Sequence, residues 1–92
     1  MSLSLDDYRT KLINKILFAS SQEEVKGFID TAIKAFGQHK VSVHIIVRFL
    51  DKISSELDLF NPMDKDAQQW SNIKVARIHF FRIKRSLESL AL

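Results

Sequence analysis

Residues 70–90, "WSNIKVARIHFFRIKRSLESL", decide the expected fold, because their apolar side chains recur at steps of three or four residues. That spacing places the side chains along one side of an α-helix. The resulting stripe contains Trp70, Ile73, Ala76, Phe80, Ile83, Leu87 and Leu90. We therefore expect a long C-terminal helix whose apolar side packs against shorter helices and extends beyond them.

The preceding residues "NPMD", 61–64, predict where this helix starts. An asparagine side chain caps the free N–H groups of a first helical turn, and a proline in the first helical position loses no hydrogen bond. Asp64 adds a negative charge near the positive end of the helix. These signals predict a helix from residue 62 to residue 90.

Capping signals also delimit two helices in the first part of the chain. Ser4 with Asp7 predicts a capping box at the start of the first helix, and Ser21 with Glu24 predicts another at the start of the second. Gly37 follows the last apolar residue of the second helix, which is where a helix-ending glycine is favoured. Two amphipathic helices are therefore expected before the middle of the chain.

The third apolar segment, 42–60, is less regular than the others. Residues 41–47 are rich in β-branched side chains and partly alternate, so a strand is the alternative there. A single strand would have nothing to pair with, and the apolar residues further along continue at helical spacing. We predict a helix, and its apolar flanks predict a central, widely buried element.

Together these elements predict an all-α fold of one domain, residues 1–92. The chain contains two glycines and one proline, which are too few for the turns of an all-β fold of this length. Short connections favour antiparallel packing of successive helices. The expected architecture is a small up-and-down bundle or array of four helices, at approximately 4–19, 21–36, 42–60 and 62–90.

The composition argues against several classes of function. A chain without cysteine has no zinc–thiolate site and no cysteine nucleophile. His39, His44 and His79 lack the four-residue spacing with which two imidazoles on a helix bind one metal, and there is no glycine-rich phosphate loop. We expect a protein that is not an enzyme, without catalytic, cofactor-binding or metal-binding residues. With no leader-like segment and no long apolar run, a cytoplasmic protein is expected.

Positive charge is concentrated in the predicted last helix. Residues 1–66 contain nine Lys and Arg against ten Asp and Glu, whereas residues 67–92 contain five against one. The five cations are Lys74, Arg77, Arg82, Lys84 and Arg85. Such a segment favours nucleic acid, whose phosphates attract lysine and arginine. The cations are spread around the helix, however, and the outward positions are isoleucine and phenylalanine rather than polar side chains able to read bases.

Phe80 and Phe81 are neighbours in sequence and therefore point about 100° apart on a helix. Phe80 belongs to the apolar stripe, whereas Phe81 and Ile78 project from the other side. Three interpretations compete: the last helix is central and buries both residues, the two are exposed and contact a protein, or the basic segment binds nucleic acid. A membrane-surface helix is favoured least, because the better apolar face is needed for the core.

We predict a protein-binding surface on the last helix. Large exposed apolar side chains bordered by cations are typical of protein interfaces. The expected partner-binding residues are the anchors Ile78 and Phe81 and the basic rim Lys74, Arg82 and Arg85. The partner is expected to be another protein or a second copy. A second copy is the simplest case, because antiparallel pairing of two such helices buries the same surface on each copy. Binding of nucleic acid by residues 74–85 is the alternative.

Overall fold

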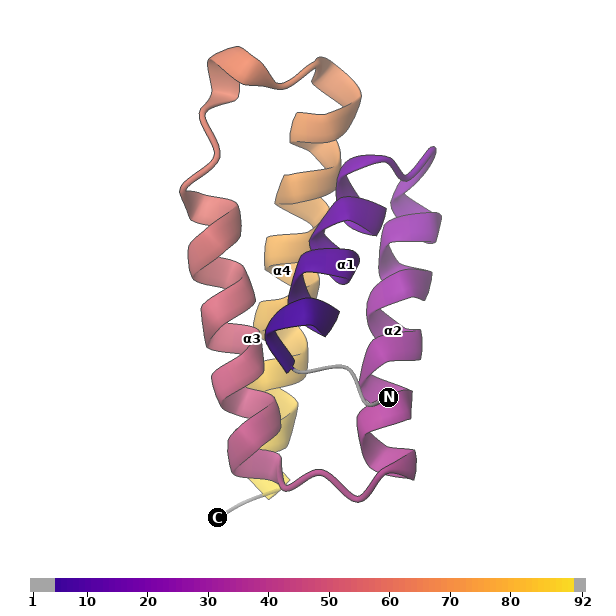
Figure 1. Ribbon diagram of the computed structural model, residues 1–92, viewed down its shortest axis with the longest axis vertical. Helices are drawn as coiled ribbons and strands as arrows, with labels where there is room; N and C mark the ends of the chain where they lie inside the picture. The colour runs from indigo at the N-terminus through magenta and orange to yellow at the C-terminus, as the bar shows by residue number, and fades with distance from the viewer. Residues whose placement is uncertain (1–4, 91–92) are drawn as a thin grey trace.

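The computed structural model describes residues 5–90 and shows the all-α class with four α-helices. These are α1 (Leu5–Leu17), α2 (Gln22–Gln38), α3 (Val43–Asp58) and α4 (Ala67–Leu90), with a short 3-10 turn, η1 (Pro62–Asp64), before the last. They run alternately up and down, and α4 is the longest (Figure 1). No strand occurs among residues 5–90, so the strand alternative at 41–47 is wrong.

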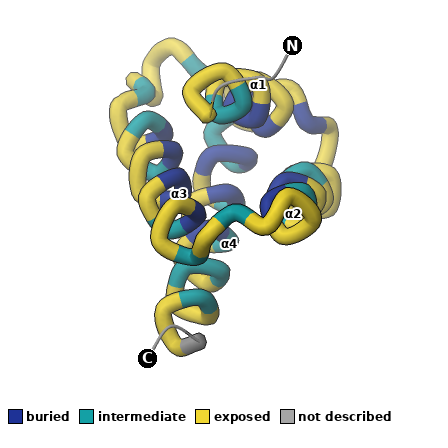
Figure 2. Tube along the Cα trace, turned by 60° about the horizontal axis from the view of Figure 1, so that its bottom comes forward, coloured by how far each residue is buried: buried dark blue, intermediate teal, exposed yellow. Residues whose placement is uncertain are grey.

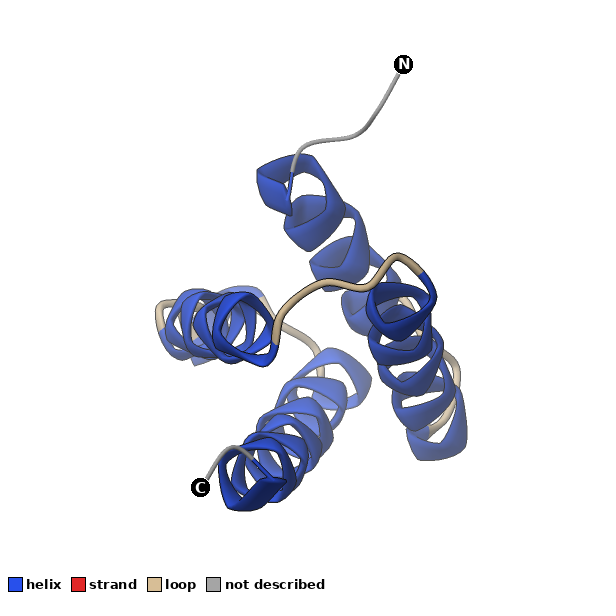
Figure 3. Cartoon of the chain, turned by 90° about the horizontal axis from the view of Figure 1, so that it is seen from below, coloured by secondary structure: helices blue, strands red, loops and turns tan. Residues whose placement is uncertain are grey.

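The four helices have different places in the bundle. α1 and α4 each pack against all three other helices, whereas α2 and α3 flank this pair on opposite sides (Figure 3). The expectation that the third helix is widely buried is wrong, because Ile45 is exposed and Val43 and Val47 are only half-buried. α3 buries one face, and the apolar flanks of that face lie at the surface.

The core lies where the apolar stripes of the helices meet. Its largest fully buried apolar side chains are Phe80, Ile16, Ile29, Leu50, Ile53, Leu57, Ile73 and Val25. The rings of Tyr8, Phe36 and Phe49 join α1, α2 and α3, with centroids between 4.9 and 6.2 Å apart. The C-terminal turns of α4 reach past this core and are exposed or half-buried (Figure 2), as the length of the predicted helix suggested.

Among residues 5–90, one fully buried side chain is polar: Asn72 of α4. Its amide nitrogen donates to the carbonyl oxygen of Ala19 at 2.9 Å and, at 3.4 Å, to that of Leu17. Its amide oxygen accepts from the side chain of Gln68 at 2.9 Å. The last carbonyls of a helix have no partner within the helix. Asn72 therefore satisfies the end of α1 and ties it to α4.

The start of α2 confirms one predicted cap and corrects its detail. The Ser21 hydroxyl accepts from the backbone N–H of Glu24 at 3.1 Å, as predicted. The Glu24 carboxylate binds Ser20 rather than Ser21, accepting from its hydroxyl at 2.7 Å and from its N–H at 3.2 Å. Two hydrogen bonds lower the pKa of Glu24: chiefly the one from the Ser20 hydroxyl, and to a smaller extent the one from the Ser20 N–H. The other predicted capping box depends on Ser4, which lies outside the described residues.

The end of α2 overturns the role predicted for Gly37. The helix continues to Gln38, and the left-handed residue after its cap is Lys40, with φ of 56°. The N–H of Val41 donates to the carbonyl of Phe36 at 3.0 Å, and the N–H of Lys40 donates to that of Gly37 at 3.2 Å. This pair of hydrogen bonds is the Schellman motif. Val41 packs against the core, so tertiary contact rather than the glycine sets where the helix ends.

This assignment predicts that a glycine at position 40 and an alanine at position 37 would each stabilise the protein. Lys40→Gly removes the penalty of a side chain in the left-handed region and should raise the free energy of unfolding by about 1 kcal/mol. Gly37→Ala should add about 0.5–1 kcal/mol, because Gly37 is helical and an added Cβ would meet nothing within 4 Å. Urea unfolding of both variants tests this. Destabilisation by Gly37→Ala would contradict this assignment and would indicate that the helix ends at residue 37.

The start of α4 is also later than predicted. Asn61 caps as expected, accepting from the N–H of Met63 at 3.0 Å, but only the 3-10 turn follows. Lys65 is extended, and α4 begins at Ala67. Asp66 and Gln69 form the actual capping box: the N–H of Gln69 donates to the Asp66 carboxylate at 2.7 Å, and the N–H of Asp66 donates to the Gln69 side chain at 3.3 Å. We placed the start of the helix at Asn61 and Pro62, and the capping box of Asp66 and Gln69 was therefore not predicted.

Candidate protein-interaction surface

Each side of α4 has a different environment. Ile73, Ala76 and Phe80 are buried in the core. On the side of α3, Arg77 pairs with Asp58 and Lys84 with Asp51, each at 2.7 Å. On the side of α2, the imidazole of His79 lies 2.7 Å from the carboxylate of Asp30. The remaining side of α4, opposite the core, is not covered by another helix.

Ile78 and Phe81 lie on this uncovered side, with 56% and 59% of their surfaces exposed, whereas Phe80 is only 1% exposed. The interpretation in which α4 buries both residues is therefore wrong. Although α4 is central, the other three helices cover only part of its circumference. Two adjacent phenylalanines thus have opposite environments, as the 100° step between helical neighbours requires.

Four of the five predicted partner-binding residues follow one line along α4. Lys74, Ile78, Phe81 and Arg85 succeed one another at steps of four, three and four residues, which is the spacing of one helical face. Arg82 lies at the edge of this line, on the side nearer α2. All five are exposed, and we call them together the outer face of α4.

Three cations of the outer face form no ion pair with any residue that the structure describes: Lys74, Arg82 and Arg85. The Arg85 guanidinium lies 5.8 Å from the centroid of the Phe81 ring, and the Lys74 ammonium lies 6.0 Å from that of Trp70. Both distances are in the range of cation–π attraction. Lys74 and Arg85 thus lie beside aromatic rings, and all three cations keep their hydrogen-bonding groups available to a partner.

Lys84 differs from these three. The pKa of Lys84 is raised, chiefly by its hydrogen bond with the Asp51 carboxylate and to a smaller extent by the negative charge of that group. Arg77 is engaged in the same way by Asp58. Two of the five cations in segment 74–85 are thus already partly neutralised by α3.

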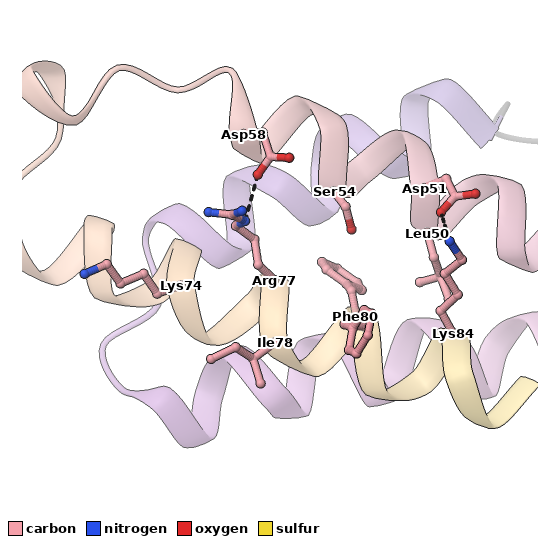
Figure 4. A pocket seen from close by; sticks show the side chains of 10 residues that line it. Leu50, Asp51, Ser54, Asp58, Lys74, Arg77, Ile78, Phe80 and Lys84 are labelled. Atoms are coloured by element: carbon pink, nitrogen blue, oxygen red, sulfur yellow. Dashed lines mark ion pairs between the residues drawn. The ribbon is translucent and has the colours of Figure 1, made fainter.

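The outer face borders a surface groove between α3 and α4, with a volume of about 540 Å³ (Figure 4). Leu50 and Phe80 form its floor, and the two ion pairs of Asp51 and Asp58 bridge the helices across it (Figure 4). Its lining residues are Leu50, Asp51, Ser54, Asp58, Lys74, Arg77, Ile78, Phe80, Phe81 and Lys84. Three predicted partner-binding residues, Lys74, Ile78 and Phe81, therefore line one concave site.

A second hollow, of about 780 Å³, continues along the same two helices. It is lined by Val43, His44, Val47, Arg48, Arg85, Glu88 and Ser89. We call the two hollows together the α3–α4 groove. Sequence reasoning missed all of its α3 residues. The seven-residue separation of Asp51 and Asp58 places them on one helical face, but only the tertiary pairing of α3 with α4 gives that face a neighbour.

Other apolar residues whose exposure the sequence leaves open do not extend this surface. Phe18 and Leu59 are exposed, but each lies just after the end of its helix, and neither lines the α3–α4 groove. Tyr8 is half-buried against the core. Trp70, which was predicted as part of the apolar stripe, is also half-buried against the core. The outer face of α4 is therefore a separate patch.

No cluster of three or more metal-binding side chains is found within residues 5–90. In the same range, no helix has the length and apolar character that crossing a membrane requires. Comparison of the chain with protein-family models, with curated proteins and with solved structures gives no match. The chemistry of the surface is thus the basis for assigning a function.

Proposed function

We propose that this chain is a non-enzymatic protein-interaction domain whose partner, another protein or a second copy, covers the outer face of α4. The observation that carries the proposal is the exposure of Ile78 and Phe81, each by more than half, on adjacent turns of a helix whose opposite side forms the core. Exposed large apolar side chains that are contiguous and bordered by polar groups mark contact sites. Phenylalanine and arginine are enriched in protein interfaces, which supports the same assignment.

Nucleic acid binding by the basic segment 74–85 receives weaker support. Arg77 and Lys84 already pair with carboxylates of α3, which reduces the charge available to phosphates. The line of side chains facing solvent also has Ile78 and Phe81 at its centre, and neither offers a hydrogen bond to a base edge. The surface therefore resembles a protein contact more closely than a track for a phosphate backbone.

Photo-cross-linking from the outer face tests the proposed function directly. Benzoylphenylalanine placed at Phe81 preserves an aromatic side chain, and the same replacement at Phe18, which is 76% exposed, is a matched control. After irradiation in living cells, mass spectrometry identifies the cross-linked chains. From position 81, but not from position 18, we expect adducts with one specific polypeptide, which is either another protein or a second copy of this chain. Equal labelling from both positions would contradict the proposal.

The variant Phe81→Asp is expected to remain folded and to lose association. Phe81 is exposed, so its replacement should change the free energy of unfolding by less than about 1 kcal/mol. Any self-association seen by light scattering across protein concentration should disappear, as should cross-linking from a probe moved to Ile78. Thermal unfolding followed by circular dichroism is the control. Loss of a cooperative transition would show that Phe81 supports the core, because burying a carboxylate costs several kcal/mol, about 3 or more.

A further inference from the structure

We infer that the occupant of the outer face is an acidic amphipathic helix, which lies along the α3–α4 groove with its apolar side on Ile78 and Phe81. This inference rests on the proposed function, because it names the kind of protein segment that the surface binds. Its basis is the match between the shape and charge of the groove and those of such a helix.

The shape of the site favours a helix over an extended segment. The two walls of the groove are antiparallel helices, and the outer face from Lys74 to Arg85 extends for about 16 Å. Its apolar anchors are separated by three residues, so they form a ridge of the kind that fits between the side chains of another helix. An amphipathic helix with apolar residues at three- and four-residue spacing is the usual occupant of such a groove. An extended strand needs free backbone groups, which two complete helices do not offer.

The charge of the site favours acidic flanks on that helix. Arg48 of α3 and Lys74 and Arg85 of α4 line the groove, and none of them pairs with a carboxylate among the residues described. The α3 carboxylates nearest to α4 are already used by Arg77 and Lys84. Within the described lining, Glu88 is the carboxylate that remains outside these ion pairs. The groove therefore presents an excess of cations, distributed along its length.

The same charges disfavour a second copy as the occupant. Pairing two outer faces would bring the cations Lys74, Arg82 and Arg85 of one copy close to the three cations of the other copy. Glu88 of each copy would be the nearest carboxylate available to offset these six cations. Like charges placed together in an interface weaken it, whereas carboxylates from a different chain would strengthen it. We therefore favour a heterologous acidic helix over the symmetric pair.

A displayed library of helix-forming peptides of about 18 residues, roughly 27 Å long, tests the inference without presuming a sequence. The library is selected on the immobilised protein, and the enriched peptides are synthesised and titrated by fluorescence anisotropy. Four protein variants complete the design. Phe81→Ser is matched by Phe18→Ser, which removes an exposed phenylalanine elsewhere, and Arg85→Glu is matched by Lys34→Glu, which makes the same change of charge on the exposed side of α2.

We expect enriched peptides with apolar residues at three- and four-residue spacing, bordered by Asp and Glu. Their affinity should fall at least about 30-fold with Phe81→Ser and about fivefold with Arg85→Glu, while both control variants bind as the unmodified protein does. Added salt should weaken binding, since the rim charges are exposed.

Three results would overturn the inference, and they bear differently on the proposed function. Enriched peptides that are neutral or basic but still require Phe81 would show that the surface binds protein with a different preference. Self-association abolished by Phe81→Ser would identify a second copy as the occupant, again with the proposed function intact. If no enriched peptide depends on Phe81, the acidic helix is wrong, and cross-linking from position 81 decides separately whether the surface binds protein.

Discussion

Replacing Phe80 with alanine is expected to lower the free energy of unfolding by about 3–5 kcal/mol, whereas replacing Phe81 with alanine should change it by less than about 0.5 kcal/mol. Phe80 is 1% exposed and lies beside Leu50 on the floor between α3 and α4. Truncating it removes a large apolar group from the core and leaves a cavity that neighbours fill only in part. Phe81 loses little, because more than half of its surface is already in water.

The Phe80 effect is large compared with the total stability of small domains, which is about 5–15 kcal/mol. A loss of 3–5 kcal/mol would therefore leave a marginally folded protein, visible as a large fall in the midpoint of urea unfolding. Phe80→Leu is a milder control that should retain most of the stability, since it keeps an apolar side chain of moderate size. Similar losses from Phe80→Ala and Phe81→Ala would contradict the orientation of α4 described above.

The second large effect is expected at Asn72. Asn72→Ala should lower the free energy of unfolding by about 2–3 kcal/mol and the melting temperature by about 10–20 °C. The substitution leaves the carbonyl oxygens of Leu17 and Ala19 without their donor in a site that water does not reach. An unsatisfied buried acceptor loses the hydrogen bonds that water provides in the unfolded chain. Calorimetry of Asn72→Ala, with the exposed Asn14→Ala as the matched control, measures this difference.

The near-isosteric change Asn72→Asp separates the lost hydrogen bonds from the lost volume. At neutral pH it should destabilise more than Asn72→Ala, because a buried carboxylate would face two carbonyl oxygens. Such a carboxyl would have a folded-state pKa above its unfolded value of about 3.9. The variant should therefore regain stability, relative to the unmodified protein, as the pH falls through that raised pKa, since the protonated group again donates a hydrogen bond. Unchanged stability of Asn72→Asp at neutral pH would mean that Asn72 acts through its volume alone.

Helical periodicity predicted those features that depend on one helix at a time. The steps of three and four residues in α4 distinguished Phe80 from Phe81 before any contact was known, and the structure places them as that spacing requires. The cap at Ser21 was predicted for the same reason, because its hydrogen bond to Glu24 is local. Local patterns thus identified the four helices and the orientation of the outer face.

Features that depend on the packing of distant segments were not predictable in this way. Asn72 looked like an ordinary polar residue of α4, because its partners at the end of α1 are more than fifty residues away in the chain. Gly37 looked like a helix end, but the docking of Val41 on the core moved that end. The α3 wall of the groove was missed because nothing local indicates which helix lies beside α4.

The pairing of α1 with α4 has a consequence for the order in which the protein folds. These two helices are the first and the last along the chain, yet each contacts every other helix, and the hydrogen bond from Asn72 to Ala19 joins residues 53 positions apart. Neighbours in sequence, α2 and α3, lie on opposite sides of that pair. A nascent chain that has produced only the first three helices can bring the rings of Tyr8, Phe36 and Phe49 together, but it lacks α4, against which all three helices pack. Closing such a distant contact slows folding relative to bundles built from local contacts, and the core can be completed only once α4 has been made.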